Sequence, residues 1–85
     1  MFEVVITSEA QAQAMRLPRS IQARLQEVFD RLTRWPQVSG AKSLRGALKG
    51  AFRIRTGDYR VLFNLDPARR RIVIFRIADR RDVYE

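Results

Sequence analysis

The sequence predicts one α+β domain with the order β-α-α-β-β-β, in which a helical hairpin packs on one face of a twisted, mostly antiparallel sheet. Two observations predict this class. Apolar residues recur with helical spacing before Gly40 and with a period of two after it. The chain has 85 residues, of which 46% are hydrophobic, so it fits a single folded domain over residues 1–85 and not a disordered tail.

The chain is expected to open with a strand and a short helix. Residues 1–6, MFEVVI, are mostly β-branched and aromatic, which favours a strand. Ser8 and Gln11 lie three residues apart and match a capping box. A helix is therefore expected from Ser8 toward Leu17.

A second, longer helix is expected over residues 18–34. Pro18 suits the first turn of a helix and ends the helix before it. One apolar stripe marks the face that enters the core, and it consists of Ile21, Leu25, Val28, Phe29 and Leu32. Pro36 disfavours a helical conformation of Trp35, so the helix ends there and the indole is expected to fill the junction between helix and sheet.

Three consecutive antiparallel strands are expected in the second half of the chain. AFRIR (residues 51–55) and DYRVLFNL (58–65) are joined by Thr56-Gly57, a short hairpin connection. DPARR makes the next turn, which leads into RIVIFRIA (71–78). Together with residues 1–6, these segments form the predicted sheet.

Basic residues outnumber acidic ones by 17 to 9, which gives a net charge of +8. All of the basic residues except Lys42 and Lys49 are arginine, which binds phosphate through planar, bidentate hydrogen bonds. A polyanionic partner is therefore expected. The alternative is a coding bias that spreads arginine over a solvated surface, which explains the number of arginines better than their placement.

Some residue types are missing altogether. The chain has no Cys and no His, which excludes a disulfide framework, the usual zinc ligands and the usual general base. No metal and no cofactor are expected. The longest apolar stretch is IVIF (72–75), which is too short for a signal peptide or a membrane span, so a cytoplasmic protein without membrane contact is expected.

The alternation of side chains along the strands predicts a basic face. Arg53, Arg55 and Arg60 point away from the apolar residues of their strands, toward the face that the helices leave open. Like charges gathered on one face repel each other and attract an incoming polyanion. The alternative is an ordinary solvated face whose arginines pair in part with acidic residues, namely Asp58, Asp66, Asp79 and Asp82.

The last strand is expected to add Arg76 to this basic face. In this interpretation Val73, Phe75 and Ile77 join the apolar face, and Arg76 shares the other face with Ile72 and Ile74. The segment DRRDVY then brings Arg80, Arg81 and Tyr84 to the end of the sheet. The aromatic residues Phe2, Phe29 and Phe75 are expected in the core and not as platforms for stacked bases.

Three segments in this order resemble the RelE/ParE superfamily of bacterial toxins, and more closely its RelE-like branch: LRGALKG (44–50), FRIRTGDYRVLF (52–63) and IADRRDVY (77–84). The resemblance covers almost the whole chain. It implies a microbial-ribonuclease-like fold and a toxin of a type II toxin-antitoxin system. It also implies a ribosome-dependent endoribonuclease, an mRNA interferase, that inhibits translation by cutting mRNA in the ribosomal A site, and neutralisation by a cognate antitoxin.

The resemblance also suggests site residues. The basic strand positions of the family fall on Arg53, Arg55 and Arg60, its C-terminal arginine on Arg80 or Arg81, and its terminal tyrosine on Tyr84. Well-studied relatives carry lysine at the first two of these positions, and arginine cannot replace lysine as a base because it keeps its proton.

RNA supplies its own nucleophile, the 2′-hydroxyl, so a protein needs only to orient it, take its proton and stabilise the developing charge. The expected catalytic residues are Tyr84, as general base, with Arg60 and Arg81 as stabilisers of charge. The expected RNA-binding residues are Arg45, Lys49, Arg53, Arg55, Arg76 and Arg80. Lys49 or a water molecule is the candidate donor of a proton to the leaving group.

Two other functions stay open from the sequence. A ParE-like toxin has a similar scaffold but binds DNA gyrase and is not a nuclease. A non-catalytic RNA-binding module would use the same basic face without cutting RNA. For either toxin, the expected partner is a small antitoxin with an acidic segment that folds along the basic groove.

Overall fold

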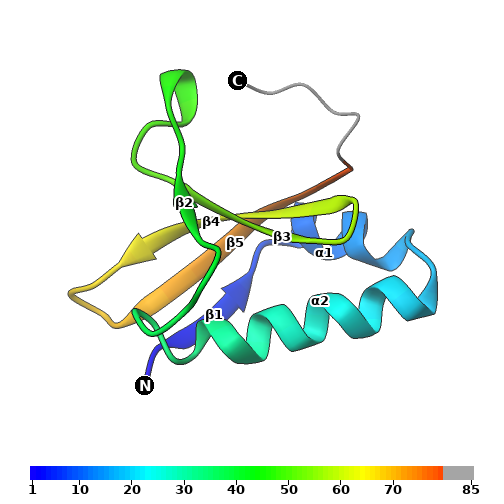
Figure 1. The fold of residues 1–85 in the computed structure, drawn as a ribbon, viewed down its shortest axis with the longest axis horizontal. Helices are drawn as coiled ribbons and strands as arrows, with labels where there is room; N and C mark the ends of the chain where they lie inside the picture. The colour runs from blue at the N-terminus through cyan, green and yellow to red at the C-terminus, as the bar shows by residue number, and fades with distance from the viewer. Residues whose placement is uncertain (80–85) are drawn as a thin grey trace.

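Two helices cover one face of a five-stranded sheet in the computed structural model, which describes residues 1–79 (Figure 1). The elements, in chain order, are β1 (Glu3–Ile6), α1 (Ser8–Met15), α2 (Arg19–Leu32), β2 (Lys42–Ser43), the 3₁₀ turn η1 (Gly46–Leu48), β3 (Phe52–Thr56), β4 (Tyr59–Asp66) and β5 (Arg71–Asp79). The predicted α+β class with a helical hairpin is confirmed. No helix within residues 1–79 is long and apolar enough to span a membrane.

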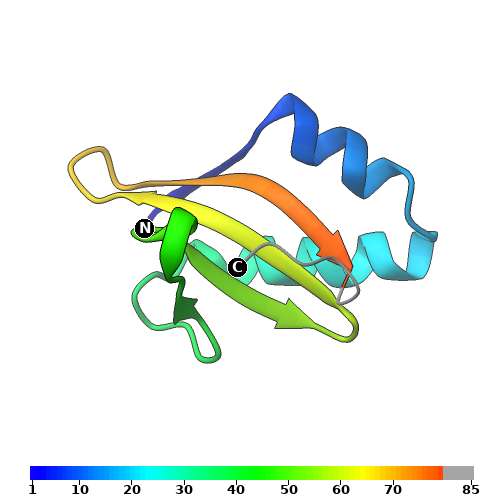
Figure 2. The ribbon, with the colours of Figure 1, turned by 90° about the horizontal axis from the view of Figure 1, so that it is seen from above.

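The sheet has the order β1-β5-β4-β3-β2. Strand β1 pairs with β5 in parallel, and all other neighbours are antiparallel, so the sheet is mostly antiparallel as predicted. The chain therefore passes from β1 at one edge of the sheet through α1, which lies beside β5, and α2, which lies beneath the sheet, before the meander begins (Figure 2). The sequence did not predict β2 or η1, because elements of two and three residues are too short to show a period.

The main core lies between α2 and the sheet. Leu25, Val28 and Leu32 of α2 are buried against the central strands, as the predicted stripe requires. Trp35 follows α2 and packs edge-on against Phe52 and Phe63, with ring centroids 5.2 and 5.7 Å away. The predicted position of this indole at the junction of helix and sheet is confirmed.

The start of α1 differs by one residue from the prediction. Thr7, and not Ser8, is the N-cap: its Oγ1 accepts a hydrogen bond from the backbone N–H of Ala10 at 3.2 Å. Thr7 also donates its own N–H to the carbonyl of Ile74, which fixes the helix start against β5. Thr7 therefore links the start of α1 to β5 through two hydrogen bonds, one to each element.

This geometry makes a prediction that separates the two candidate caps. Thr7→Ala should lower the free energy of unfolding by about 1 kcal/mol, because an orphan N–H at the helix start loses its acceptor. Ser8→Ala should leave it nearly unchanged, since Ser8 is exposed and already inside the helix. Urea unfolding of the two variants checks this, and an equal loss in both would show that Thr7 does not act as the cap.

The faces to which the side chains of β5 point also differ from the prediction, because a β-bulge interrupts the pairing of β5 with β4. Leu62 pairs with Arg76, but the next residue, Phe63, pairs with Ile74, so Phe75 is the extra residue. The sequence pattern gave no sign of this bulge. The prediction that Val73 and Phe75 join the core is wrong, as is the one that places Ile72 and Ile74 on the open face.

The bulge gives β5 apolar residues toward the helices on both sides of the irregularity. Ile72 and Ile74 before it and Ile77 after it all belong to the main core. Phe75 instead packs on the open face with Leu62, in a second, smaller apolar cluster. The N–H of Ile77 donates to Oε1 of Gln13 at 2.8 Å, which ties α1 to β5 beyond the bulge.

Candidate nucleic-acid interface

Four arginines from three neighbouring strands lie on the face of the sheet opposite α1 and α2. On β3 the alternate residue Ile54 is buried in the main core, so Arg53 and Arg55 face the other way. On β4 Arg60 alternates with the buried Val61. Across the sheet from Leu62 lies Arg76, which brings β5 to the same face despite the bulge. We call these four residues, Arg53, Arg55, Arg60 and Arg76, the arginine cluster.

Arg60 occupies the centre of the arginine cluster. Arg55 is directly opposite it on β3, where Cβ atoms of paired residues are about 5 Å apart. Arg53 and Arg76 are its diagonal neighbours on the two flanking strands, at about 7–8 Å. The other three members therefore flank Arg60 on the two neighbouring strands.

The hairpin between β3 and β4 sets this arrangement. Thr56 pairs with Tyr59, so the loop is Gly57-Asp58, one residue later than predicted. Gly57 has a φ of 58°, which matches the first loop position of a type II′ hairpin. Because a two-residue loop fixes the register of its strands, it fixes Arg55 opposite Arg60.

The arginine cluster combines charge with partial burial. Arg53, Arg60 and Arg76 are half-buried, whereas Arg55 is exposed. Like charges directly opposite each other in a sheet are destabilising, and partial burial reduces the screening between them. Four positive charges gathered on one face attract a polyanion such as the phosphate backbone of a nucleic acid.

The smaller apolar cluster holds the segment around η1 beside the arginine cluster. Leu44, Ala51 and Leu62 are buried together, with Leu48 of η1 packed on them. This segment stands on the side of the sheet opposite α2 (Figure 1). Arg45 and Lys49 are the residues that flank η1, and both are exposed. They are not part of the sheet surface itself.

Lys42 is a further basic residue of this face that the sequence interpretation did not select. It pairs with Arg53 through β2 and is exposed. No sequence signal could place it, because a two-residue strand has no visible alternation. Three of the predicted site residues, Arg80, Arg81 and Tyr84, lie outside the described residues.

The chain matches the family model of the ParE toxin of type II toxin-antitoxin systems, parDE, over residues 4–84. Two curated relatives come from Mycobacterium tuberculosis. The chain is 39% identical to Toxin RelE over 84 residues, which cover 98% of this chain and 86% of the relative. It is 37% identical to Toxin RelG over 84 residues, which cover 98% of this chain and 95% of that relative.

Solved structures agree with these matches. The toxin-antitoxin complex RelBE2 from Mycobacterium tuberculosis has a chain with a TM-score of 0.83 and 35% identity, covering 95% of this chain and 93% of that one. The archaeal RelE-RelB complex from Pyrococcus horikoshii gives a TM-score of 0.80 and 25% identity, with 96% and 98% covered. The isolated RelE toxin of E. coli, at 13% identity and a TM-score of 0.78, shares the fold and covers 100% of this chain and 89% of its own.

The fold, the length of the match and the identity to the curated relatives lead to one conclusion. The chain belongs to the ParE toxin family within the RelE/ParE superfamily, and it is a RelE-like toxin of a type II toxin-antitoxin system.

Proposed function

We propose that this toxin is a ribosome-dependent endoribonuclease that cuts mRNA in the A site and so inhibits translation. The observation that carries the proposal is Arg60, half-buried on the open face of the sheet with three arginines around it. The names of the two curated relatives, RelE and RelG, support a RelE-like function over a ParE-like one. The chain would act in the cytoplasm, where ribosomes are.

In this proposal the 2′-hydroxyl of the RNA attacks the adjacent phosphorus, and the bond to the 5′-oxygen of the next nucleotide breaks. Arg60 and Arg81 stabilise the charge that develops on the phosphate oxygens. Tyr84 takes the proton of the 2′-hydroxyl, since a phenol can act as a base where guanidinium groups favour its phenolate form. The leaving oxygen receives a proton from Lys49 or from water.

The remaining basic residues hold the substrate. Arg53, Arg55, Arg76 and Arg80 contact the phosphates on either side of the cleaved bond, and Arg45 and Lys49, which flank η1, make further contacts. Arginine is a poor acid and base at neutral pH, so free RNA should be cut slowly and the ribosome should supply the positioning. In this proposal a chain without histidine cleaves RNA because the substrate supplies the nucleophile and the ribosome supplies the positioning.

A cognate antitoxin is the proposed protein partner. Chains similar to this one were solved as RelBE and RelE-RelB complexes. An acidic, largely disordered antitoxin segment would neutralise the arginine cluster and fold as it binds.

Cleavage of mRNA by the purified chain, with and without programmed ribosomes, tests the proposal. Primer extension should show cuts in the A-site codon only when ribosomes are present. Tyr84→Phe should lower the cleavage rate by about 10²-fold or more, since one general catalyst is lost, while ribosome binding stays the same. Unchanged cleavage by this variant would remove Tyr84 from the mechanism.

A ParE-like function is the second candidate, because the matching family model is that of ParE toxins. Such a toxin would bind DNA gyrase through the basic face without cutting RNA. Growth arrest on expression, together with intact mRNA and inhibited supercoiling by gyrase, would favour this candidate over the nuclease.

A further inference from the structure

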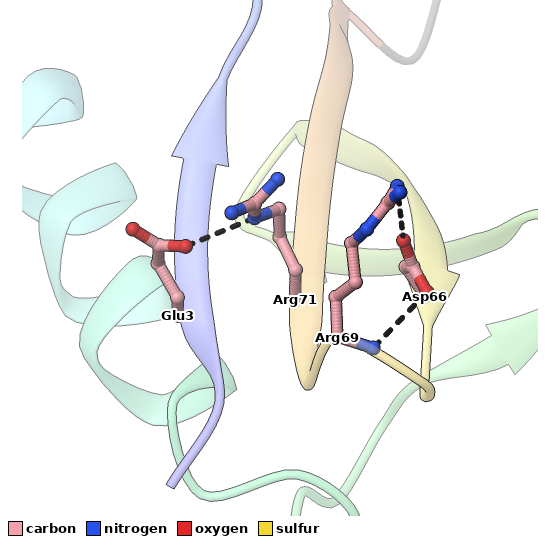
Figure 3. Close-up of polar contacts among 4 residues, drawn as sticks. All are labelled: Glu3, Asp66, Arg69 and Arg71. Carbon is pink, nitrogen blue, oxygen red and sulfur yellow. Dashed lines mark hydrogen bonds and ion pairs between the residues drawn. The ribbon is translucent and has the colours of Figure 1, made fainter.

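Three consecutive arginines lie where β4 turns into β5, at the opposite end of β4 from the Gly57-Asp58 hairpin. Two of them have carboxylate partners (Figure 3). Arg69 pairs with Asp66 at 3.5 Å, and Arg71 pairs with Glu3 at 2.9 Å. Arg70, between them, forms no ion pair with any carboxylate of residues 1–79.

The backbone of Arg70 adopts a conformation that glycine would hold with less strain. Its φ is 52°, and Arg70 is the only residue other than glycine with a positive φ among residues 1–79. A non-glycine residue in this region costs on the order of 1 kcal/mol or more. The guanidinium lies over the ring of Phe2, 5.4 Å from its centroid, so the side chain is held in one place.

Arg70 and Arg34 line the same surface cavity of about 380 Å³. Arg34 follows the end of α2, is exposed and, like Arg70, has no carboxylate partner in the part of the chain that the structure describes. The other lining residues are Met1, Thr33, Trp35 and Gln37. Two arginines from different elements, neither with a carboxylate partner among residues 1–79, thus line one concave surface.

We propose that this cavity binds a phosphate of ribosomal RNA, as a second contact that rests on the proposed function. Two guanidinium groups and the Gln37 amide supply donors for phosphate oxygens. The lining also has an apolar part, because it includes the exposed Met1 as well as Trp35, so an acidic peptide is the competing ligand that the experiment has to separate from RNA.

The position of the cavity explains why an RNA assembly is the proposed ligand. Four of the six lining residues follow directly after α2, whereas the arginine cluster lies on the face of the sheet opposite α2. One short mRNA segment held at the cluster does not reach the cavity. Ribosomal RNA that surrounds the toxin on several sides can contact both at once.

Trp35 makes the test direct, because it is the only tryptophan of the chain and lines the cavity. The purified toxin is titrated with protein-free small-subunit ribosomal RNA, and tryptophan emission is followed at several salt concentrations. Arg34→Gln combined with Arg70→Gln should weaken binding about tenfold or more, since charge-assisted hydrogen bonds are lost. The slope of log K against log salt should fall by about 1.

Arg69→Gln is the matched control, because it removes a neighbouring exposed arginine that already has a carboxylate partner and does not line the cavity. It should bind RNA like the wild type. Arg70→Gly should raise the midpoint of thermal unfolding while it weakens RNA binding, because glycine relieves the backbone strain. A purely structural role for Arg70 would lower the midpoint instead.

Equal affinity and equal salt slope in the double variant and the wild type would overturn this inference, even if ribosome-dependent cleavage is found. Loss of antitoxin binding with RNA binding unchanged would also overturn it, and would assign the cavity to an acidic peptide. If Arg34 and Arg70 are needed for RNA binding but no mRNA is cut on ribosomes, the second contact stands and the proposed nuclease function fails.

Discussion

Arg60→Gln should lower the rate of ribosome-dependent cleavage by about 10²–10³-fold, as expected when one group that stabilises transition-state charge is lost. Arg60 is the central member of the arginine cluster, so no neighbour on the face can take its place in the same geometry. The measurement is the single-turnover rate at saturating ribosomes, which separates chemistry from binding. Arg60→Lys should recover part of the rate, since it keeps the charge but not the planar fork.

Arg55→Gln is the matched variant within the arginine cluster. Arg55 lies directly opposite Arg60 but is exposed, so its loss should mainly weaken RNA binding and reduce the salt slope, with a smaller effect on the saturated rate. Urea unfolding of both variants is the control for folding. If Arg60→Gln lost as much free energy of unfolding as it lost in transition-state stabilisation, Arg60 would be a structural residue.

Phe63→Ala should remove about 3–5 kcal/mol from the free energy of unfolding, which is a large share of the stability of a small domain. The ring is fully buried, stacks on Phe52 at 5.7 Å and meets Trp35 edge-on. It therefore joins the end of α2 to the middle of the sheet. Urea unfolding followed by Trp35 fluorescence measures the loss, because the indole reports on this contact.

Phe75→Ala is the control for Phe63, because it deletes the same side chain from the opposite face of the sheet. Phe75 is half-buried and packs only on the smaller apolar cluster, so its loss should cost clearly less. Equal losses would mean that the smaller apolar cluster contributes as much to the stability of the domain as the core on the helix face.

Much of the fold could be predicted from the sequence, because periodic patterns of sufficient length mark helices and strands. The stripe on α2, the β3–β4 hairpin and the position of Trp35 are examples. The bulge at Phe75 could not be predicted, since it depends on pairing with β4 and leaves the sequence of β5 apolar in either register. The alternation of side chains therefore failed in β5 although it worked in β3 and β4.

The site could be predicted in part for the same reason. Arg53, Arg55 and Arg60 follow from alternation along two strands joined by a short loop. The predicted face of Arg76 is right although the predicted face of Ile72 and Ile74 is wrong, because the bulge at Phe75 shifts the alternation of side chains by one residue between Ile74 and Arg76. Lys42 and the cavity at Arg34 and Arg70 depend on contacts between distant segments, which no local pattern contains.

The hydrogen bond between Gln13 and Ile77 bears on self-association of the toxin. Strand β1 pairs with β5 only as far as Ile74, so the later part of β5 would present an open strand edge to other molecules. Open edges invite a second chain to add its own strand, which leads to aggregation. The Gln13 side chain accepts the hydrogen bond of the Ile77 N–H, and α1 lies along this edge. The side chain therefore satisfies a backbone donor that a longer β1 would otherwise pair, and the helix covers the edge against a second chain.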